Sequence, residues 1–180
     1  PGKKKNNAYL KLVQKGIKID YISGNHDFWM DGFFETQMRI KIHKDFLNID
    51  YDNLRLHLIH GDGLASSDKG YRLLKKIFRN RFNIWLYRKL PPDWAIPLAK
   101  AVSSSSRKHS ARQETTFASD YEVYAEKILN DGYDIVAIGH LHMPIYKDYN
   151  NGIYINTGDF IDHFSYARLA DGKIRLEYIE

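Results

Sequence analysis

Three short apolar segments, each running directly into a polar loop, constrain the fold of this chain most. The segments are residues 17–23, 54–59 and 134–138, and the loops that follow them are Gly24-Asn25-His26-Asp27, His60-Gly61-Asp62-Gly63 and Gly139-His140-Leu141-His142. Segments of this length, rich in branched apolar residues and bounded by glycine, predict β-strands. Because binding sites in open α/β sheets form at the carboxyl ends of strands, we expect the three loops to meet at one sheet edge.

Helix and hairpin signals around these strands predict a mixed sheet with helices packed on it. Helices are predicted at 8–15 and 117–131, and a mostly helical stretch at 69–102 is broken at Pro91-Pro92. The serine run at 103–106 predicts a loop. Asn150-Asn151-Gly152 and Asp171-Gly172, each between apolar stretches, predict two β-hairpins.

Composition excludes several classes of site. The chain has 180 residues and no cysteine, which rules out a disulfide scaffold, a cysteine-ligated zinc site and a thiol nucleophile. No apolar run approaches the roughly 20 residues that cross a bilayer as a helix. A length near 180 residues is typical of one domain, large enough to bury a core.

Basic residues are concentrated in one internal segment, residues 69–112. This segment holds twelve lysines and arginines and a single acid, Asp93, a balance of +11, whereas the rest of the chain has 15 basic and 21 acidic residues. Large apolar side chains interleave with these cations. The segment is therefore either a solvated helical surface that packs on the body or a surface for an acylated, phosphorylated ligand and an anionic membrane. Its apolar content favours lipid over nucleic acid as the partner.

The three polar loops contain side chains that bind metal ions. Imidazole nitrogens and amide oxygens are ligands of intermediate softness. The residues that can converge are Asn25, His26, His60, Asp62, His140 and His142. In a strand, alternate side chains share a face, so the rings of His140 and His142 are expected to project to the same side.

The remaining histidines lack this context. None of them follows a strand that ends in a glycine-containing polar loop, and we expect them to have surface or packing roles; they are His43, His57, His109 and His163.

The chain resembles the calcineurin-like metallophosphoesterases in three motifs and their order along the sequence: Gly-Asn-His-Asp, then His-Gly-Asp, then Gly-His-X-His. This resemblance implies an α/β fold, a four-layer α/β/β/α sandwich that holds two divalent metal ions at its strand ends. It also implies a body formed by residues 1–68 and 113–180 and a helical cap insertion at 69–112. The implied activity is metal-dependent hydrolysis of a phosphoric ester or diphosphate.

The resemblance also assigns roles to individual residues. Asn25, His60 and His140 would bind one metal ion and His142 the other. His26 would act near the scissile phosphate as a catalytic residue, with Asp27 as its orienting partner. The mixed ligand set suits Mn²⁺, with iron and zinc as alternatives.

One part of the family pattern is missing from this chain. The family has an earlier Asp-X-His and a Gly-Asp whose aspartate bridges the two metal ions, and neither precedes Gly24. The chain also does not begin with methionine. We therefore expect it to be N-terminally incomplete, which leaves open whether these 180 residues are active alone.

Within the family, the chain is most similar to members that act on an acylated UDP-sugar in lipid A biosynthesis. The shared features are His60-Gly61-Asp62-Gly63-Leu64, Asp68-Lys69-Gly70-Tyr71, the basic aromatic insertion, Ser105-Ser106-Arg107, Trp29 and Asn156-Thr157-Gly158-Asp159-Phe160. The implied reaction cleaves the diphosphate of UDP-2,3-diacylglucosamine to UMP and 2,3-diacylglucosamine 1-phosphate. Substrate-binding residues would be Asp68, Tyr71, Ser106 and Arg107.

The same resemblance implies a cytoplasmic protein bound peripherally at the inner membrane of a Gram-negative bacterium, with no nucleic-acid partner. Two alternatives stay open from the sequence. One is a metallophosphoesterase that acts on nucleotides or phosphoproteins. The other is a non-catalytic protein that uses this fold as a binding scaffold.

Overall fold

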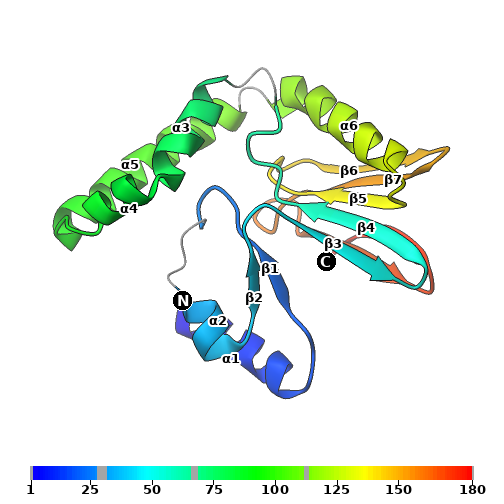
Figure 1. The fold of residues 1–180 in the computed structure, drawn as a ribbon, viewed down its shortest axis with the longest axis horizontal. Coiled ribbons are helices and arrows are strands. Elements are labelled where there is room, and N and C mark those ends of the chain that lie inside the picture. The colour runs from blue at the N-terminus through cyan, green and yellow to red at the C-terminus, as the bar shows by residue number, and fades with distance from the viewer. Residues whose placement is uncertain (1, 28–31, 66–68, 112–113, 180) are drawn as a thin grey trace.

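The computed structural model describes residues 2–27, 32–65, 69–111 and 114–179 and has the mixed α/β architecture expected from the sequence (Figure 1). Its first half contains α1 (Gly2–Gln14), β1 (Asp20–Ile22), α2 (Phe33–Met38), β2 (Lys41–His43), β3 (Phe46–Tyr51), β4 (Leu54–Ile59) and α3 (Lys69–Arg79). Its second half contains α4 (Arg81–Tyr87), α5 (Pro92–Ala111), α6 (Glu114–Asn130), β5 (Ile135–Ile138), β6 (Pro144–Tyr149), β7 (Gly152–Thr157), β8 (Ser165–Ala170) and β9 (Lys173–Tyr178).

A five-stranded sheet in the order β3-β4-β5-β7-β6 forms the centre of the molecule. β4, β5 and β7 are parallel neighbours, whereas β3 and β6 are antiparallel edge strands. Ile59 pairs with Ile138, and Ile138 pairs with Asn156, so the three parallel strands end at one level. The loops after β4 and β5 therefore meet at one edge, as predicted, whereas the third loop, residues 24–27, follows β1 of a separate two-stranded sheet and does not end at that edge.

Helix α6 covers one face of this sheet (Figure 1). Its apolar residues recur every four positions and are buried; they are Phe117, Tyr121, Ala125 and Leu129. They form one core cluster with Val136, Ile138 and Tyr154 of the sheet. Because a buried apolar side chain of this size contributes about 1.5–3 kcal/mol, this stripe fixes the helix on the strands that carry the polar loops.

The hairpin of β8 and β9 packs on the opposite face of the sheet. Leu56, Ile135 and Ile155 form a second core cluster with Ile174 of β9. Consecutive residues of β5 thus serve the two faces alternately, as the strand repeat requires. β1 and β2 form a separate two-stranded parallel sheet, which lies with α1 and α2 at the far side of the molecule from α6 (Figure 1).

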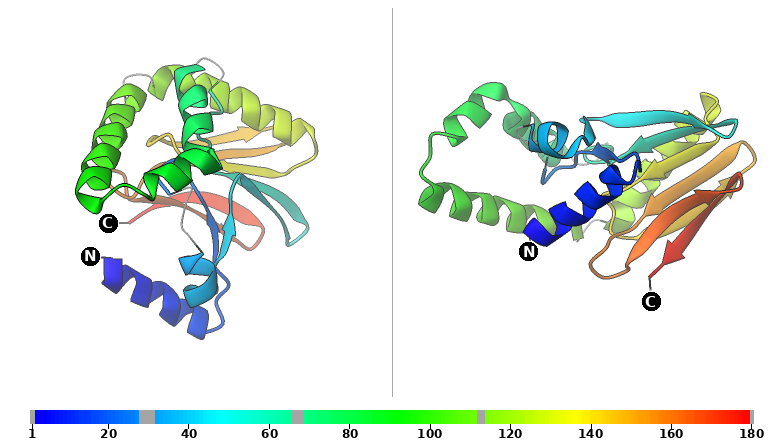
Figure 2. Two further views of the ribbon diagram at one scale, coloured as in Figure 1. Left: turned by 60° about the vertical axis from the view of Figure 1, so that its left-hand side comes forward. Right: turned by 90° about the horizontal axis from the view of Figure 1, so that it is seen from below.

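Helices α3, α4 and α5 project from the body, as two further views show (Figure 2). The prediction of a loop at the serine run is wrong, because α5 continues through residues 103–106 to Ala111. Each serine in a helix interior lowers helix stability by less than about 0.7 kcal/mol relative to alanine. The run also contains no glycine or proline that would end the helix. The division into a body and a cap at residues 69 and 112 stays a prediction.

Candidate active site

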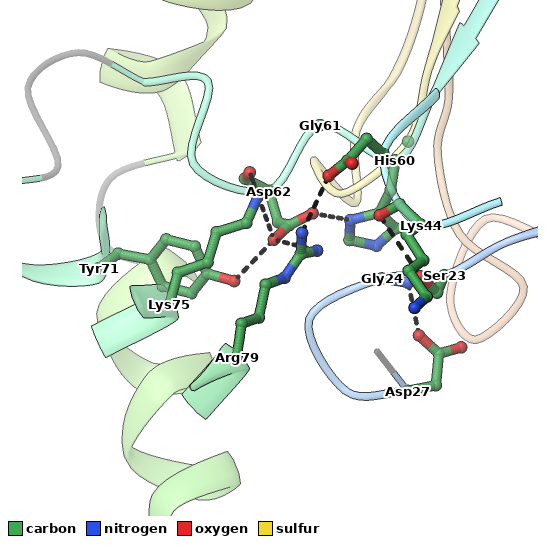
Figure 3. Close-up of polar contacts among 12 residues, drawn as sticks. Ser23, Gly24, Asp27, Lys44, His60, Gly61, Asp62, Tyr71, Lys75 and Arg79 are labelled. Carbon is green, nitrogen blue, oxygen red and sulfur yellow. Dashed lines mark hydrogen bonds and ion pairs between the residues drawn. The ribbon is translucent and has the colours of Figure 1, made fainter. Parts of the chain in front are cut away.

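His60, the first residue after β4, is held from two sides (Figure 3). Its Nδ1 lies 3.2 Å from Asp62 Oδ1. A Cβ added at Gly24 would lie 2.7 Å from His60 Cδ2 and closer still to Nε2, so the ring packs directly on the Gly24 backbone. Because Nδ1–H donates to the carboxylate, the lone pair on Nε2 faces the loop that contains Asn25.

His140 lies beside His60. Their ring centroids are 5.1 Å apart, and the His140 ring also stacks on Tyr121 at 6.4 Å. The strand alternation expected for His140 and His142 does not apply, because β5 ends at Ile138 and His140 has a left-handed backbone with φ 67°. Instead the chain turns here.

Burial and the charges of other histidines affect the protonation of His140. The pKa of His140 is lowered to about 3, chiefly by burial and also by the nearby charges of His60, His142 and His26, against the effect of Asp62. His140 is therefore neutral at physiological pH, which is the protonation state of a metal ligand.

The predicted ligands are brought together only in part. His60 and His140 are adjacent, His142 is exposed, and Asn25 is half-buried one residue from the Gly24 contact. Within the described ranges, no group of three or more His, Asp or Glu side chains is arranged to hold a metal ion. His60 and His140 thus fit as two ligands of one ion by donor type and proximity, and the four-residue set stays a prediction.

Asp27 orders the loop after β1. Its carboxylate accepts a hydrogen bond of 2.5 Å from the Gly24 N–H and another from the Tyr21 hydroxyl. Burial, followed by this bond to Asp27, raises the pKa of Tyr21. His26 is exposed in the same loop. The catalytic roles of His26 and Asp27 stay predictions.

One of the four predicted substrate-binding residues can be placed fully. Tyr71 of α3 donates its hydroxyl to Asp62 Oδ2 at 3.2 Å, and its ring lies 6.0 Å from that of His140. Tyr71 is therefore beside the histidine pair, and its role in substrate binding stays a prediction. Asp68 lies outside the described residues, as do the side chains of Ser106 and Arg107, although their backbone belongs to α5.

Two cations that the sequence did not single out join this group through Asp62 (Figure 3). Lys75 Nζ lies 2.9 Å and Arg79 Nη2 3.6 Å from Asp62 Oδ2. Burial alone would raise the pKa of Asp62, but hydrogen bonds from His60 and Lys75 hold it well below its ordinary value. The four-residue spacing of Tyr71, Lys75 and Arg79 on one helix face was the signal for this cluster.

Three histidines assigned surface or packing roles have them. His57 is buried, with Nδ1 2.7 Å from Asn48 and Nε2 2.9 Å from the Tyr124 hydroxyl. His43 pairs with Asp20 at 2.8 Å and His163 with Asp159 at 2.7 Å. The side chain of His109 lies outside the described part of the chain.

Comparison with known proteins bears on this site. No protein-family model matches the chain. It is 27% identical over 175 residues to UDP-2,3-diacylglucosamine hydrolase of Aeromonas salmonicida, covering 94% of this chain and 69% of that protein. The protein of the same name from Porphyromonas gingivalis is 24% identical over 190 residues, covering 94% and 72%. The resemblance predicted from the sequence is confirmed. Both relatives are named as hydrolases, which supports the prediction of an enzyme.

Among solved structures, an archaeal phosphodiesterase aligns with 95% of this chain and 74% of its own at 12% identity, with a TM-score of 0.46.

Proposed function

We propose that this chain takes part in hydrolysis of the diphosphate of UDP-2,3-diacylglucosamine, giving UMP and 2,3-diacylglucosamine 1-phosphate in lipid A biosynthesis. The observation that carries the proposal is the pairing of His60 with His140 at the carboxyl edge of the sheet, beside Tyr71. The names of the relatives supply the substrate class.

The residues of the site have separable tasks in this reaction. Divalent ions, for which we propose Mn²⁺, would be held by His60 and His140, with Asn25 and His142 as further ligands. Such an ion would polarise a phosphate oxygen. Asp62 fixes the tautomer and orientation of His60, and burial keeps His140 unprotonated. His26 is exposed in the loop after β1 and would approach the bound phosphate from there.

The projecting helices offer a surface for the acylated part of the substrate and for an anionic membrane. Large apolar side chains are exposed along them: Leu73, Ile77, Phe82, Trp85, Leu86, Trp94, Ile96 and Leu98. A cavity of about 620 Å³ on α4 is lined by Arg81, Ile84, Trp85, Arg88 and Lys89. Lys89 Nζ lies 5.6 Å above the Trp85 ring. Apolar and cationic groups side by side suit an amphiphilic anion.

Comparison of acylated and unacylated substrate tests the proposal. Each acyl CH₂ removed from water contributes about 0.8 kcal/mol, so burial of four would favour the acylated substrate by a factor of about 200. We expect kcat/KM for UDP-2,3-diacylglucosamine to exceed that for UDP-glucosamine by at least about 100-fold. Release of UMP, measured by chromatography, gives both values. Equal values would favour the second candidate, a metallophosphoesterase acting on nucleotides.

Binding to lipid vesicles tests the membrane partner. No helix in the described ranges is long and apolar enough to cross a bilayer. We expect the protein to co-sediment with phosphatidylglycerol vesicles and not with phosphatidylcholine vesicles. Trp85→Ala should weaken this binding about tenfold, because an interfacial tryptophan is lost. Tyr146→Ala, which removes an exposed aromatic ring on β6, is the matched control and should have no effect. Equal losses in the two variants would contradict a membrane contact at α4.

A further inference from the structure

We propose that Asp62 is a positioning residue that ties helix α3 to the His60 loop, so that one carboxylate sets both the ring of His60 and the place of Tyr71. The catalytic consequence of this arrangement rests on the proposed function. The structural arrangement itself does not.

The two oxygens of Asp62 serve different parts of the molecule (Figure 3). Oδ1 lies 3.2 Å from Nδ1 of His60 in the loop after β4. Oδ2 accepts from Tyr71 at 3.2 Å and from Lys75 at 2.9 Å, both on α3. Lys75 Nζ also donates to the Asp62 carbonyl oxygen at 2.7 Å. The carboxylate of Asp62 therefore links α3 directly to the ring of His60.

Burial makes these contacts necessary. The Asp62 side chain is only 5% exposed, and a buried carboxylate is stable only when charged and hydrogen-bonded partners replace water. Arg79 adds a weaker contact at 3.6 Å and reaches Asp45 in the β2–β3 turn at 3.1 Å. Helix α3 is thus anchored on two separate loops of the body.

Loss of the Lys75 charge should loosen α3 and leave the His60 contact in place. Tyr71 would then be held beside His140 only by its own bond to Asp62 Oδ2 and by the weaker contact of Arg79, whereas Oδ1 of Asp62 would still orient His60. Substrate binding should suffer more than chemistry. We expect Lys75→Gln to raise KM for UDP-2,3-diacylglucosamine about tenfold and to change kcat less than about threefold. Lys75→Arg should restore KM to within about threefold of wild type, because it keeps the charge.

Amide hydrogen exchange tests the contact without any substrate. In Lys75→Gln, exchange of the amides of residues 70–79 should accelerate at least about tenfold, whereas exchange in β5 stays unchanged. Lys76→Gln removes an exposed charge from the next position of α3 and is the matched control, expected to match wild type. Equal exchange at α3 in Lys75→Gln and Lys76→Gln would overturn the proposal.

The two measurements separate the two hypotheses. A wild-type protein that never releases UMP refutes the proposed function, and exchange still decides the role of Asp62. If wild type is active and Lys75→Gln leaves exchange and KM unchanged, the role of Asp62 is refuted alone. If Lys75→Gln accelerates amide exchange in β5 as well, Arg79→Gln gives the deciding comparison, because it removes only the weaker contact with Asp62. In Arg79→Gln, amide exchange at α3 should be about threefold faster than in wild type.

Discussion

Replacing His60 or His140 with alanine should lower kcat for UDP-2,3-diacylglucosamine by more than about 10³-fold. The two ring centroids lie 5.1 Å apart, and we propose that the two side chains share a metal ion. Removing a partner that only orients a ligand costs about 10–100-fold in metal affinity or activity, so loss of a ligand itself should cost more. The fold should survive, because neither ring belongs to the two buried apolar clusters.

Turnover with saturating Mn²⁺ measures this effect, and calorimetric titration with Mn²⁺ alone gives the loss of metal affinity independently. His109→Ala on α5 is the control, since its side chain has no role in the predicted site, and its kcat should equal that of wild type. Rates within about tenfold of wild type in both His60→Ala and His140→Ala would refute their assignment as ligands.

The second large effect is expected for Gly24→Ala. The added methyl group would lie 2.7 Å and 2.9 Å from the Cδ2 and Cε1 atoms of His60, well inside van der Waals contact. Either the His60 ring or the loop of residues 24–27 must move. Because a displacement of about 1 Å at a catalytic group can cost 10²-fold in rate, we expect kcat to fall about 100-fold.

Stability separates this steric effect from general damage. Overpacking should lower the free energy of unfolding of Gly24→Ala by about 1–3 kcal/mol, measured with urea. In a His60→Ala background the same substitution should cost less than about 0.5 kcal/mol, because the ring that it meets is gone. If Gly24→Ala costs the same in both backgrounds, the packing of His60 on Gly24 is not what the glycine serves.

Local patterns predicted the elements with strong periodicity or turn chemistry. β4, β5 and α6 follow their hydrophobic repeats, and both predicted hairpins form, with Asp171 and Gly172 at φ 52° and 69°. β3 was not predicted, although the sequence contains a turn signal directly after it. Asp52 and Asn53 both have positive φ and join β3 to β4 in a tight turn. β2 and α2 are too short for a periodic pattern, and their position depends on contacts with distant residues.

The candidate site likewise contains contacts that the sequence predicted and contacts that it did not. The His60 and His140 loops converge as predicted, because the parallel strands β4 and β5 bring their carboxyl ends to one edge, whereas the loop with Gly24 contacts His60 from a separate sheet. The contacts of Asp62 with Lys75 and Arg79 were not predictable in the same way. The four-residue spacing puts Tyr71, Lys75 and Arg79 on one face of α3, but it does not specify which side chain of the body that face meets.

The hydrogen-bond ladder between β4 and β5 brings the loops that carry the two histidine rings to neighbouring positions. Ile59 and Ile138 are direct partners across that ladder. His60 follows Ile59 by one residue, and His140 follows Ile138 by two. Neighbouring strands lie about 4.8 Å apart, close to the 5.1 Å between the rings. The strand pairing therefore decides that the two loops lie side by side, and the turn at His140, with φ 67°, decides how its ring faces His60.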